Sequence, residues 1–285
     1  MSICYINGEW RSTRECTLPV TDLAIQRGVG VFDTIRYYDG RAMALAAHMK
    51  RLEDGARIAG INVEDGKVIS DLMRAVREGG RHPDCPENGN CIAKLYITGG
   101  DVDERGLFPS PRHFVILEKY LFPSPDEYKK GIALQPTTER RPYPLVKSIN
   151  YLFGIMQQAG RDDIMECLYC PDGYVTEALK NSFFICRDGK IITAPLGQVL
   201  GGVTRGIIIE LARENGFTVE ERSIEVSELS VCDEAFITGS GKEVMPVVRV
   251  GETLIAGGKP GPVAASLRKL FRENFQKWLD LGTAD

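Results

Sequence analysis

Hydrophobic and polar residues alternate along much of the first 120 positions, a pattern that predicts β-strands. Residues 30–38 read GVFDTIRYY, a strand pattern that stops at the turn Asp39-Gly40. Near the N-terminus, Asn7-Gly8 separates two short runs, and this dipeptide is typical of a tight β-hairpin. Further strands are expected at 91–98 and 113–120. We therefore predict a sheet in this part of the chain.

Two helices are predicted among these strands. In the first, at 45–59, apolar residues recur every three or four positions and Gly60 follows the last of them. The apolar face of this helix consists of Leu45, Met49, Leu52 and Ala56. The second helix is expected at 68–77. Residues 99–111 read as a polar loop of about thirteen residues, a length that usually indicates a functional or disordered loop.

A chain of 285 residues is long enough for two domains. The run Phe122-Pro-Ser-Pro-Asp126 interrupts the pattern and marks a boundary. We expect a small N-terminal domain at 1–120, a linker at 121–131 and a larger domain at 132–285. The larger domain mixes strands (132–135, 166–169, 182–186, 191–193, 218–223, 234–238) with helices (151–159, 204–215, 263–279). Because these elements follow no strict βαβ rhythm, the predicted fold class is α+β.

Composition narrows the functions that are open to the chain. Hydrophobic residues at 43% and charged residues at 26% are ordinary for a globular protein. The formal charge of −4 argues against a nucleic-acid surface, which usually has a basic face. No run of eighteen apolar residues predicts a membrane span, and the first residues do not resemble a signal peptide. We expect a cytoplasmic protein.

The eight cysteines predict neither a disulfide framework nor a metal site. Most are scattered singly, and only Cys167 and Cys170 have the spacing of half a zinc site. No second cysteine pair lies at matching spacing, and the histidines His48, His82 and His113 cluster with nothing in the sequence. Buried free thiols in a reducing compartment are the favoured interpretation, and no metal is expected.

Two glycine-rich turns are candidates for binding a phosphate. Residues 201–205 read GGVTR and lead directly into a helix, whose first N–H groups and dipole favour anions. The simpler alternative is a capped helix after a glycine turn. Residues 239–243 read GSGKE after a strand and add a hydroxyl, but they lack the spacing of a Walker A loop.

One lysine and one carboxylate complete this set of candidates. Lys147 stands in the sequence KSINY at the start of a predicted helix, although most lysines are simply solvated. A lysine that forms a Schiff base needs a lowered pKa from burial or from nearby cations. Glu177 follows a Pro-Asp-Gly turn, and a carboxylate that binds a pyridine nitrogen would keep a cofactor ring protonated. Together these features are what a pyridoxal-phosphate enzyme needs.

The order of the motifs is more specific than any one of them. Six segments in sequence order resemble the class IV (fold type IV) pyridoxal-phosphate aminotransferases, and the resemblance covers nearly the whole chain. The six segments are 27–36, 48–52, 147–151, 175–177, 202–205 and 233–246. This family includes branched-chain aminotransferases, D-amino-acid aminotransferases and aminodeoxychorismate lyase. The resemblance implies a small and a larger α/β domain in a homodimer, with a site between the domains that the second subunit completes.

The resemblance also implies roles for individual residues. Lys147 would form the Schiff base and move the α-proton, and Glu177 would bind the pyridine nitrogen. Tyr151 would lie near the cofactor, and Leu200 would pack on its ring. The phosphate would be held by four groups: the Arg51 side chain, the Val203 and Thr204 amides, and Ser240.

The chain departs from its relatives where they bind the substrate carboxylate. Familiar D-amino-acid enzymes carry Arg-x-His in the loop after the strand at 91–98, but this loop contains Arg105 and no histidine. Branched-chain enzymes carry Tyr-x-Arg in that strand, where this chain has Ile92 and Lys94. Arg27 replaces a frequent aromatic residue and Lys180 replaces a usual serine. These four cations, Arg27, Lys94, Arg105 and Lys180, are the candidates for binding the carboxylate.

The favoured prediction is a transaminase for D-amino acids, such as D-alanine or D-glutamate, with a 2-oxo acid such as 2-oxoglutarate as the acceptor. An L-branched-chain aminotransferase is the alternative, and aminodeoxychorismate lyase comes third because Arg105-Gly resembles a lyase motif. From another class, the chain could be a non-catalytic protein that binds pyridoxal phosphate or phosphate. The presence of both Lys147 and Glu177 counts against that interpretation.

Overall fold

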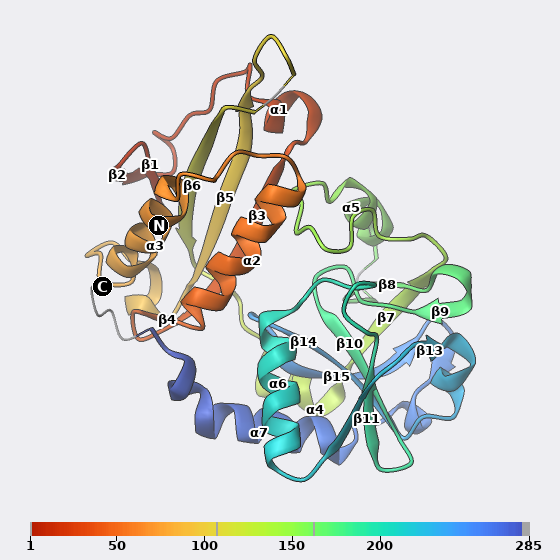
Figure 1. Ribbon diagram of the computed structural model, residues 1–285. Helices are drawn as coiled ribbons and strands as arrows, with labels where there is room; N and C mark the ends of the chain where they lie inside the picture. The colour runs from red at the N-terminus through yellow and green to blue at the C-terminus, as the bar shows by residue number, and fades with distance from the viewer. Residues whose placement is uncertain (1, 107, 162, 281–285) are drawn as a thin grey trace. The chain divides into compact units, whose positions relative to one another are not determined.

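The computed structural model describes residues 2–106, 108–161 and 163–280, and the chain divides into two compact units (Figure 1). Unit 1 comprises Met1–Leu121, Val146–Asn150 and the chain from Phe275 onward, and unit 2 comprises Phe122–Leu145 and Tyr151–Asn274. Two parts of the predicted large domain, 146–150 and 275–280, therefore group with unit 1. The last part of that predicted domain, 281–285, lies outside the described residues.

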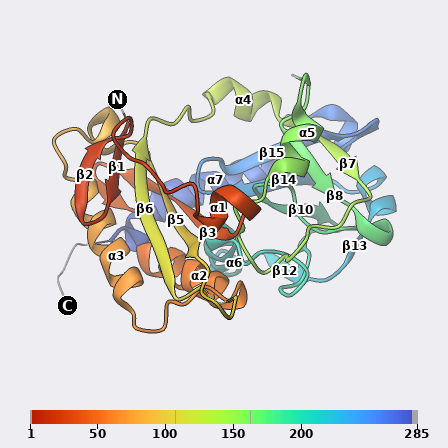
Figure 2. The same ribbon diagram turned by 90° about the horizontal axis from the view of Figure 1, so that it is seen from above.

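Unit 1 is built on a six-stranded sheet in the order β2-β1-β6-β5-β3-β4, whose pairs are antiparallel. Its strands are β1 (Ile3–Ile6), β2 (Glu9–Ser12), β3 (Gly30–Tyr38), β4 (Arg41–Ala42), β5 (Ile92–Asp101) and β6 (Ser110–Glu118). The predicted hairpin is confirmed: Asn7 and Gly8 have φ angles of 53° and 86°, as a type I′ turn requires. Figure 2 shows β5 and β6 side by side.

Helices α2 (Leu45–Ile58) and α3 (Lys67–Gly79) pack against this sheet. The other helical segments of unit 1 are α1 (Leu23–Arg27) and the shorter turns η1 (Pro86–Gly89) and η5 (Phe275–Trp278). Helix α2 packs along β3 (Figure 1). The apolar face predicted for α2 is confirmed, since Leu45, Met49, Leu52 and Ala56 are all buried in the core of unit 1.

The predicted thirteen-residue loop is shorter in the structure. Strand β5 continues to Asp101, which pairs with Ser110 at the start of β6 after a break in register beyond Thr98. A buried carboxylate explains this extension: Asp22 accepts hydrogen bonds from Thr98 Oγ1 at 2.7 Å and from Arg112 Nη1 at 3.1 Å. Contacts this distant in sequence are invisible to a local pattern.

Unit 2 contains an eight-stranded mixed sheet in the order β12-β11-β10-β14-β15-β7-β8, with β16 paired to β15. Strand β7 runs parallel to both β15 and β8, and β11 runs parallel to β12. The strands are β7 (Ile132–Thr137), β8 (Glu166–Tyr169), β10 (Ser182–Arg187), β11 (Lys190–Thr193), β12 (Thr218–Glu221), β14 (Glu234–Gly239), β15 (Glu243–Val250) and β16 (Thr253–Leu254). A separate pair joins β9 (Tyr174–Val175) to β13 (Ile224–Glu225).

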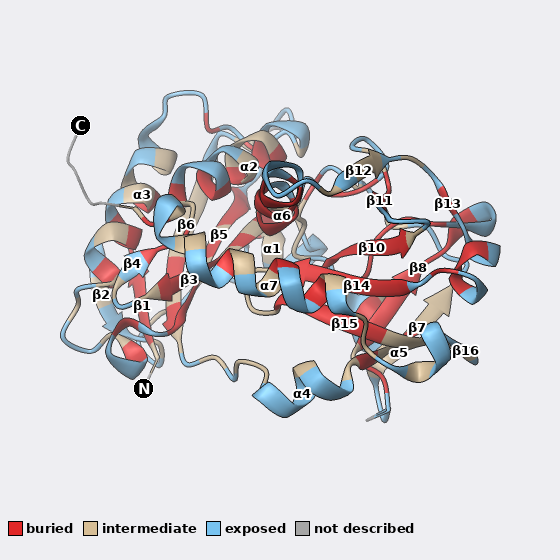
Figure 3. Cartoon of the chain, turned by 90° about the horizontal axis from the view of Figure 1, so that it is seen from below, coloured by how far each residue is buried: buried red, intermediate tan, exposed pale blue. Residues whose placement is uncertain are grey.

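Helices α6 and α7 pack against the central strands of this sheet (Figure 3). The helical segments of unit 2 are α4 (Pro125–Lys130), α5 (Leu152–Gln158), η2 (Pro171–Gly173), α6 (Val203–Glu214), η3 (Val226–Ser230), η4 (Ala256–Gly258) and α7 (Pro262–Asn274). The helix predicted at 263–279 ends at Asn274, and residues 275–278 form η5 instead. Part of the predicted linker forms α4, where Ser124 and Glu127 make a capping box. No helix among the described residues is long and apolar enough to cross a bilayer.

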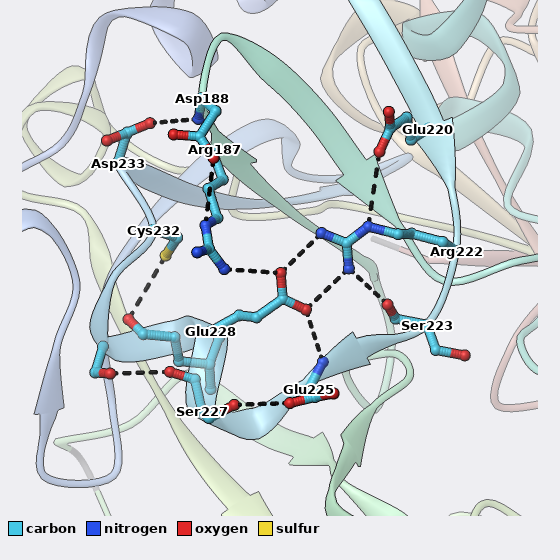
Figure 4. Close-up of polar contacts among 12 residues, drawn as sticks. Arg187, Asp188, Glu220, Arg222, Ser223, Glu225, Ser227, Glu228, Cys232 and Asp233 are labelled. Carbon is cyan, nitrogen blue, oxygen red and sulfur yellow. Dashed lines mark hydrogen bonds and ion pairs between the residues drawn. The ribbon is translucent and has the colours of Figure 1, made fainter.

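A cluster of ion pairs joins β10, β12 and η3 (Figure 4). The Glu228 carboxylate accepts hydrogen bonds from Arg222 Nη1 at 2.9 Å and Nη2 at 2.7 Å, and from Glu225 N at 2.9 Å. Arg187 Nη1 lies 3.4 Å from the same carboxylate. The hydrogen bond from Arg222 is the main reason why the pKa of Glu228 falls to about 2.

Candidate active site

The segment that carries Lys147 lies along β3 in unit 1. Phe32 N donates to Lys147 O at 2.9 Å, and Ile149 N donates to Gly30 O at 3.1 Å. A Cβ atom at Gly30 would lie 3.0 Å from Ile149 Cδ1 and 3.1 Å from the Ile97 carbonyl oxygen, so the close approach favours glycine. Lys147 is half-buried, and its Nζ lies 4.6 Å from the centre of the Phe32 ring. The lysine is therefore held at a defined position beside β3.

Arg51, on α2, forms a two-point ion pair with Asp33 on β3. Arg51 Nε and Nη2 donate to Asp33 Oδ2 and Oδ1 at 2.9 and 2.6 Å, and His48 Nδ1 lies 3.0 Å from Oδ1. Asp33 is fully buried. Burial opposes its charge, but Arg51 and His48 outweigh burial and hold the pKa of Asp33 well below its usual range. Burial is also the main reason why the pKa of His48 is lowered.

Sequence reasoning missed this cluster and treated His48 as isolated, which is wrong. The sequence of β3 nevertheless contained a signal for this cluster. Val31, Ile35 and Tyr37 are buried in the core of unit 1, and Asp33 occupies the same face of the alternating strand. An aspartate at a core-facing position needs a buried partner, because burying an unpaired charge costs several kcal/mol.

Glu177, in unit 2, is a buried carboxylate with a positive partner. Leu200 N donates to its Oε2 at 3.3 Å, and Arg141 Nη1 lies 3.5 Å from its Oε1. Burial disfavours the charge on Arg141, yet Glu177 and Tyr151 outweigh burial and raise the pKa of Arg141. The pKa of Tyr151 is raised, chiefly by burial. The Leu200 amide and the Glu177 side chain therefore lie together, and Arg141, which the sequence did not single out, joins them.

The first phosphate candidate lies at the start of α6. Gly202 is the N-cap residue and makes no side-chain capping bond, and Val203 and Thr204 are the first two helical residues. Their N–H groups have no acceptor within the helix and point toward its N-terminal end. A Cβ atom at Gly202 would lie 2.6 Å from Ser182 Oγ, so a larger residue there would force the Ser182 hydroxyl to move.

The second phosphate candidate is the turn between β14 and β15, where Ser240 is half-buried. A Cβ atom at Gly239 would lie 2.1 Å from Asn181 Oδ1, so this turn is packed against Asn181. Asn181 Nδ2 in turn donates to the buried carboxylate of Glu166, which also accepts from Lys180 N at 2.6 Å. The serine therefore lies on a turn that side chains of the β8–β10 region hold in place.

These groups fit pyridoxal phosphate. Unit 2 offers two glycine-built turns with amide and hydroxyl donors, and a buried carboxylate that forms an ion pair with Arg141. Unit 1 offers Arg51 and a lysine held against β3. Among the described residues, no group of three or more His, Cys, Asp or Glu side chains could hold a metal ion.

The four candidate cations for the substrate carboxylate differ in their surroundings. Lys94 forms an ion pair with Glu118 on the neighbouring strand β6, so its charge is already compensated. Arg105 is 80% exposed and lies 3.5 Å from Asp103. Arg27 is exposed in the last turn of α1, and Lys180 is exposed in unit 2.

The sequence profile described as amino-transferase class IV matches residues 30–250, and the chain belongs to this family. The protein is a pyridoxal-phosphate-dependent aminotransferase, as its sequence motifs predict. It is 31% identical to a provisionally named branched-chain-amino-acid aminotransferase of Methanocaldococcus jannaschii, over 96% of each chain. It is 29% identical to a D-alanine aminotransferase of Bacillus licheniformis, over 92% of this chain and 93% of the other.

A solved structure of the branched-chain amino acid aminotransferase of Escherichia coli superposes with a TM-score of 0.87 at 26% identity, covering 99% of both chains. A branched-chain amino acid aminotransferase from T.th., complexed with N-(5′-phosphopyridoxyl)-L-glutamate, has the same fold, with a TM-score of 0.84 at 24% identity over 99% of this chain and 98% of the other. The predicted α+β fold of the type IV aminotransferases is thereby confirmed.

Proposed function

We propose that the protein moves the amino group of a D-amino acid, such as D-alanine or D-glutamate, to a 2-oxo acid such as 2-oxoglutarate. The observation that carries the proposal is the ion pair between Lys94 and Glu118. Lys94 occupies the strand position where the branched-chain enzymes are expected to have the arginine of Tyr-x-Arg. Its positive charge is already compensated by Glu118. The substrate carboxylate then needs a different cation.

Within this proposal, Lys147 supplies the reacting amine and Glu177 supplies the carboxylate that sets the electronics of the ring. When bound, pyridoxal phosphate supplies an aldehyde that receives the amino group and a ring that withdraws electrons from the substrate α-carbon. Lys147 Nζ would hold the cofactor covalently, and once the substrate amine has displaced it, the free lysine amine would carry the substrate α-proton. Glu177 would bind the pyridine nitrogen, and Arg141 lies 3.5 Å from its carboxylate as a positive partner.

The phosphate is assigned to the Arg51 guanidinium, the amides of Val203 and Thr204, and the turn that carries Ser240. Support comes from the glycine positions beside these groups, where any side chain would collide with Ser182 or Asn181. Leu200 is assigned to the ring and Tyr151 to the vicinity of the cofactor. Each of these groups is a hydrogen-bond donor of a kind that binds a phosphate dianion.

Arg27 and Arg105 are proposed as anchors of the substrate carboxylate. Arg27 is exposed and Arg105 is 80% exposed, so both can offer a guanidinium to an incoming anion. A guanidinium binds a carboxylate at two points, which a lysine cannot do. Lys180 is the next candidate because it is exposed and lies three residues after Glu177.

An L-branched-chain substrate is the second candidate. It is favoured by the names of the relative from Methanocaldococcus jannaschii and of the Escherichia coli structure. Paired D- and L-isomers of alanine, glutamate, leucine and valine decide between the two, with single-turnover loss of the absorbance of the bound cofactor as the signal. D-alanine or D-glutamate is expected to react at least about tenfold faster than any L-isomer, a difference of about 1.4 kcal/mol in activation free energy. Faster reaction of L-leucine or L-valine would reject the D-specific proposal.

A homodimer is also part of the proposal. Helix α5 exposes three apolar residues at positions i, i+3 and i+4, namely Leu152 (67%), Ile155 (61%) and Met156 (66%). Three large apolar side chains on one helix face are typical of an interface. Light scattering should give twice the chain mass of 31.5 kDa, and Met156→Lys should shift that mass toward the monomer. A monomeric parent protein would refute the dimer.

A reducing compartment such as the cytoplasm fits the eight free cysteines.

A further inference from the structure

We propose that Asp33 is a positioning residue that fixes the Arg51 guanidinium for the cofactor phosphate, with His48 holding Asp33 in turn. The inference rests on the proposed assignment of Arg51 to the phosphate. It adds two residues of unit 1 that act through Arg51.

The contact between the two side chains fixes the plane of the guanidinium. Arg51 uses Nε and Nη2, which form one edge of its planar fork, and both oxygens of Asp33 accept, at 2.9 and 2.6 Å. A two-point contact of this kind removes rotation about the last bonds of the side chain. Asp33 is fully buried, whereas the Arg51 side chain is 15% exposed. The Nε–Nη2 edge of the guanidinium thus faces the buried carboxylate, and the side chain as a whole keeps some access to solvent.

The carboxylate that orients Arg51 is itself fixed. Asp33 Oδ1 accepts from Thr34 N at 2.6 Å and lies 3.0 Å from His48 Nδ1. His48 and Arg51 lie three residues apart, on the same face of α2, and this face packs against β3. The three partners come from two different elements, so the carboxylate has little freedom to turn.

Stability alone is a weak reason for a buried ion pair at this place. Removing two charges from water costs several kcal/mol for each ion, and apolar residues of similar size often stabilise a core as well or better. Val31 and Ile35 show that the same face of β3 accepts apolar side chains. The charged pair is better explained if the oriented guanidinium has a ligand to bind.

Unit 1 contains a second cluster of the same composition, which serves as a matched control. Asp71 Oδ2 lies 2.8 Å from His113 Nε2, Tyr5 OH donates to Oδ1 at 2.7 Å, and Arg74 pairs with the same carboxylate. These residues come from α3, β1 and β6 and have no assigned contact with the cofactor. Asp71 is 25% exposed and Asp33 is fully buried, so this cluster controls for the loss of an Asp–His–Arg contact but not for the loss of a buried charge.

The test measures the dissociation constants of pyridoxal phosphate and of pyridoxal, which lacks the phosphate. Equilibrium dialysis with the full chain gives both values. The ratio used here is the dissociation constant of pyridoxal divided by that of pyridoxal phosphate, and it isolates the contribution of the phosphate. Asp33→Asn should weaken the binding of pyridoxal phosphate by about 10- to 30-fold, as expected when a charged hydrogen bond to the phosphate is weakened, while pyridoxal changes less than about threefold. Asp71→Asn should leave the ratio unchanged. An unchanged ratio in folded Asp33→Asn would overturn the proposal.

Two further variants keep the test decisive. If Asp33→Asn does not fold, His48→Leu removes one donor to Asp33 and should lower the ratio by at least about threefold; an unchanged ratio overturns the proposal. In the Arg51→Ala background, Asp33→Asn should lower the ratio no further, because its effect passes through Arg51. If Asp33→Asn lowers the ratio in the Arg51→Ala background as much as it does in the parent protein, Asp33 acts by a route other than Arg51. If Arg51→Ala itself leaves the ratio unchanged, the assignment of Arg51 to the phosphate fails, and this inference fails with it.

Discussion

Replacing Glu228 with glutamine tests how much the ion-pair cluster of Figure 4 stabilises unit 2. Glu228→Gln keeps the shape of the side chain and removes its charge. The carboxylate accepts from both terminal nitrogens of Arg222 and from Glu225 N, and its pKa falls from the ordinary 4.5 to about 2. A glutamine oxygen can keep one of these hydrogen bonds but not the ionic part.

The pKa of Glu228 sets an upper limit for this contribution. A fall from 4.5 to about 2 corresponds to a ceiling of about 3.4 kcal/mol in the free energy of unfolding. Arg222 and Arg187 are 40% and 39% exposed, so solvent screens the charges from the open side of the cluster. We therefore expect Glu228→Gln to lower the free energy of unfolding by about 1–2 kcal/mol at pH 7.

The sign of the pH dependence follows from the lowered pKa of Glu228. The carboxylate stabilises the folded state above pH 4.5, and this contribution is lost as the pH falls from 4.5 toward about 2. The difference between the parent protein and Glu228→Gln should therefore shrink over that range. Urea unfolding followed by circular dichroism is suitable, because Trp10 and Trp278 both belong to unit 1 and their emission would not report on unit 2.

A neighbouring carboxylate provides the control. Glu220 pairs with Lys190 and Arg222 at the surface of the same cluster, and Glu220→Gln should leave stability unchanged. The reasoning about Glu228 fails if Glu228→Gln has no effect at pH 7, or if its effect stays constant down to about pH 3.

Three further predictions concern the reaction. Lys147→Ala should still bind pyridoxal phosphate but lose turnover by several powers of ten, and a variant with more than about a tenth of the parent activity would show that another residue reacts. Glu177→Gln should lower kcat with little change in KM, because an amide cannot hold the ring nitrogen protonated; an unchanged spectrum and kcat would remove Glu177 from the site. Arg27→Ala and Arg105→Ala should each raise the amino-acid concentration for half-maximal rate more than about thirtyfold, since losing a charge-assisted pair costs about 2–5 kcal/mol. If neither variant does so, the anchor is elsewhere and Lys180 is the next residue to replace.

How closely the predicted bounds of a helix or strand match the observed bounds depends on how that element is buried. Strand β3 has the predicted bounds Gly30–Tyr38, because one face is buried and the alternation is clear. Strand β15 (Glu243–Val250) was not predicted, since its first five residues are all buried and the apolar run there shows no alternation. Helix α7 was predicted too long, because the apolar residues after Asn274 continue the helical spacing although the helix ends there.

The sequence by itself determined the family, the cofactor and the reaction class, because the motifs that carry them are short and keep a fixed order along the chain. Only the tertiary structure decided which charges are paired. Asp33 and Arg51 form an ion pair although they are 18 residues apart in the sequence. Glu177 pairs with Arg141 from a distant segment, and Lys94 pairs with Glu118. The physical reason is that an ion pair depends on distance in space and on exclusion of water, and neither quantity is encoded in the spacing of residues along a chain.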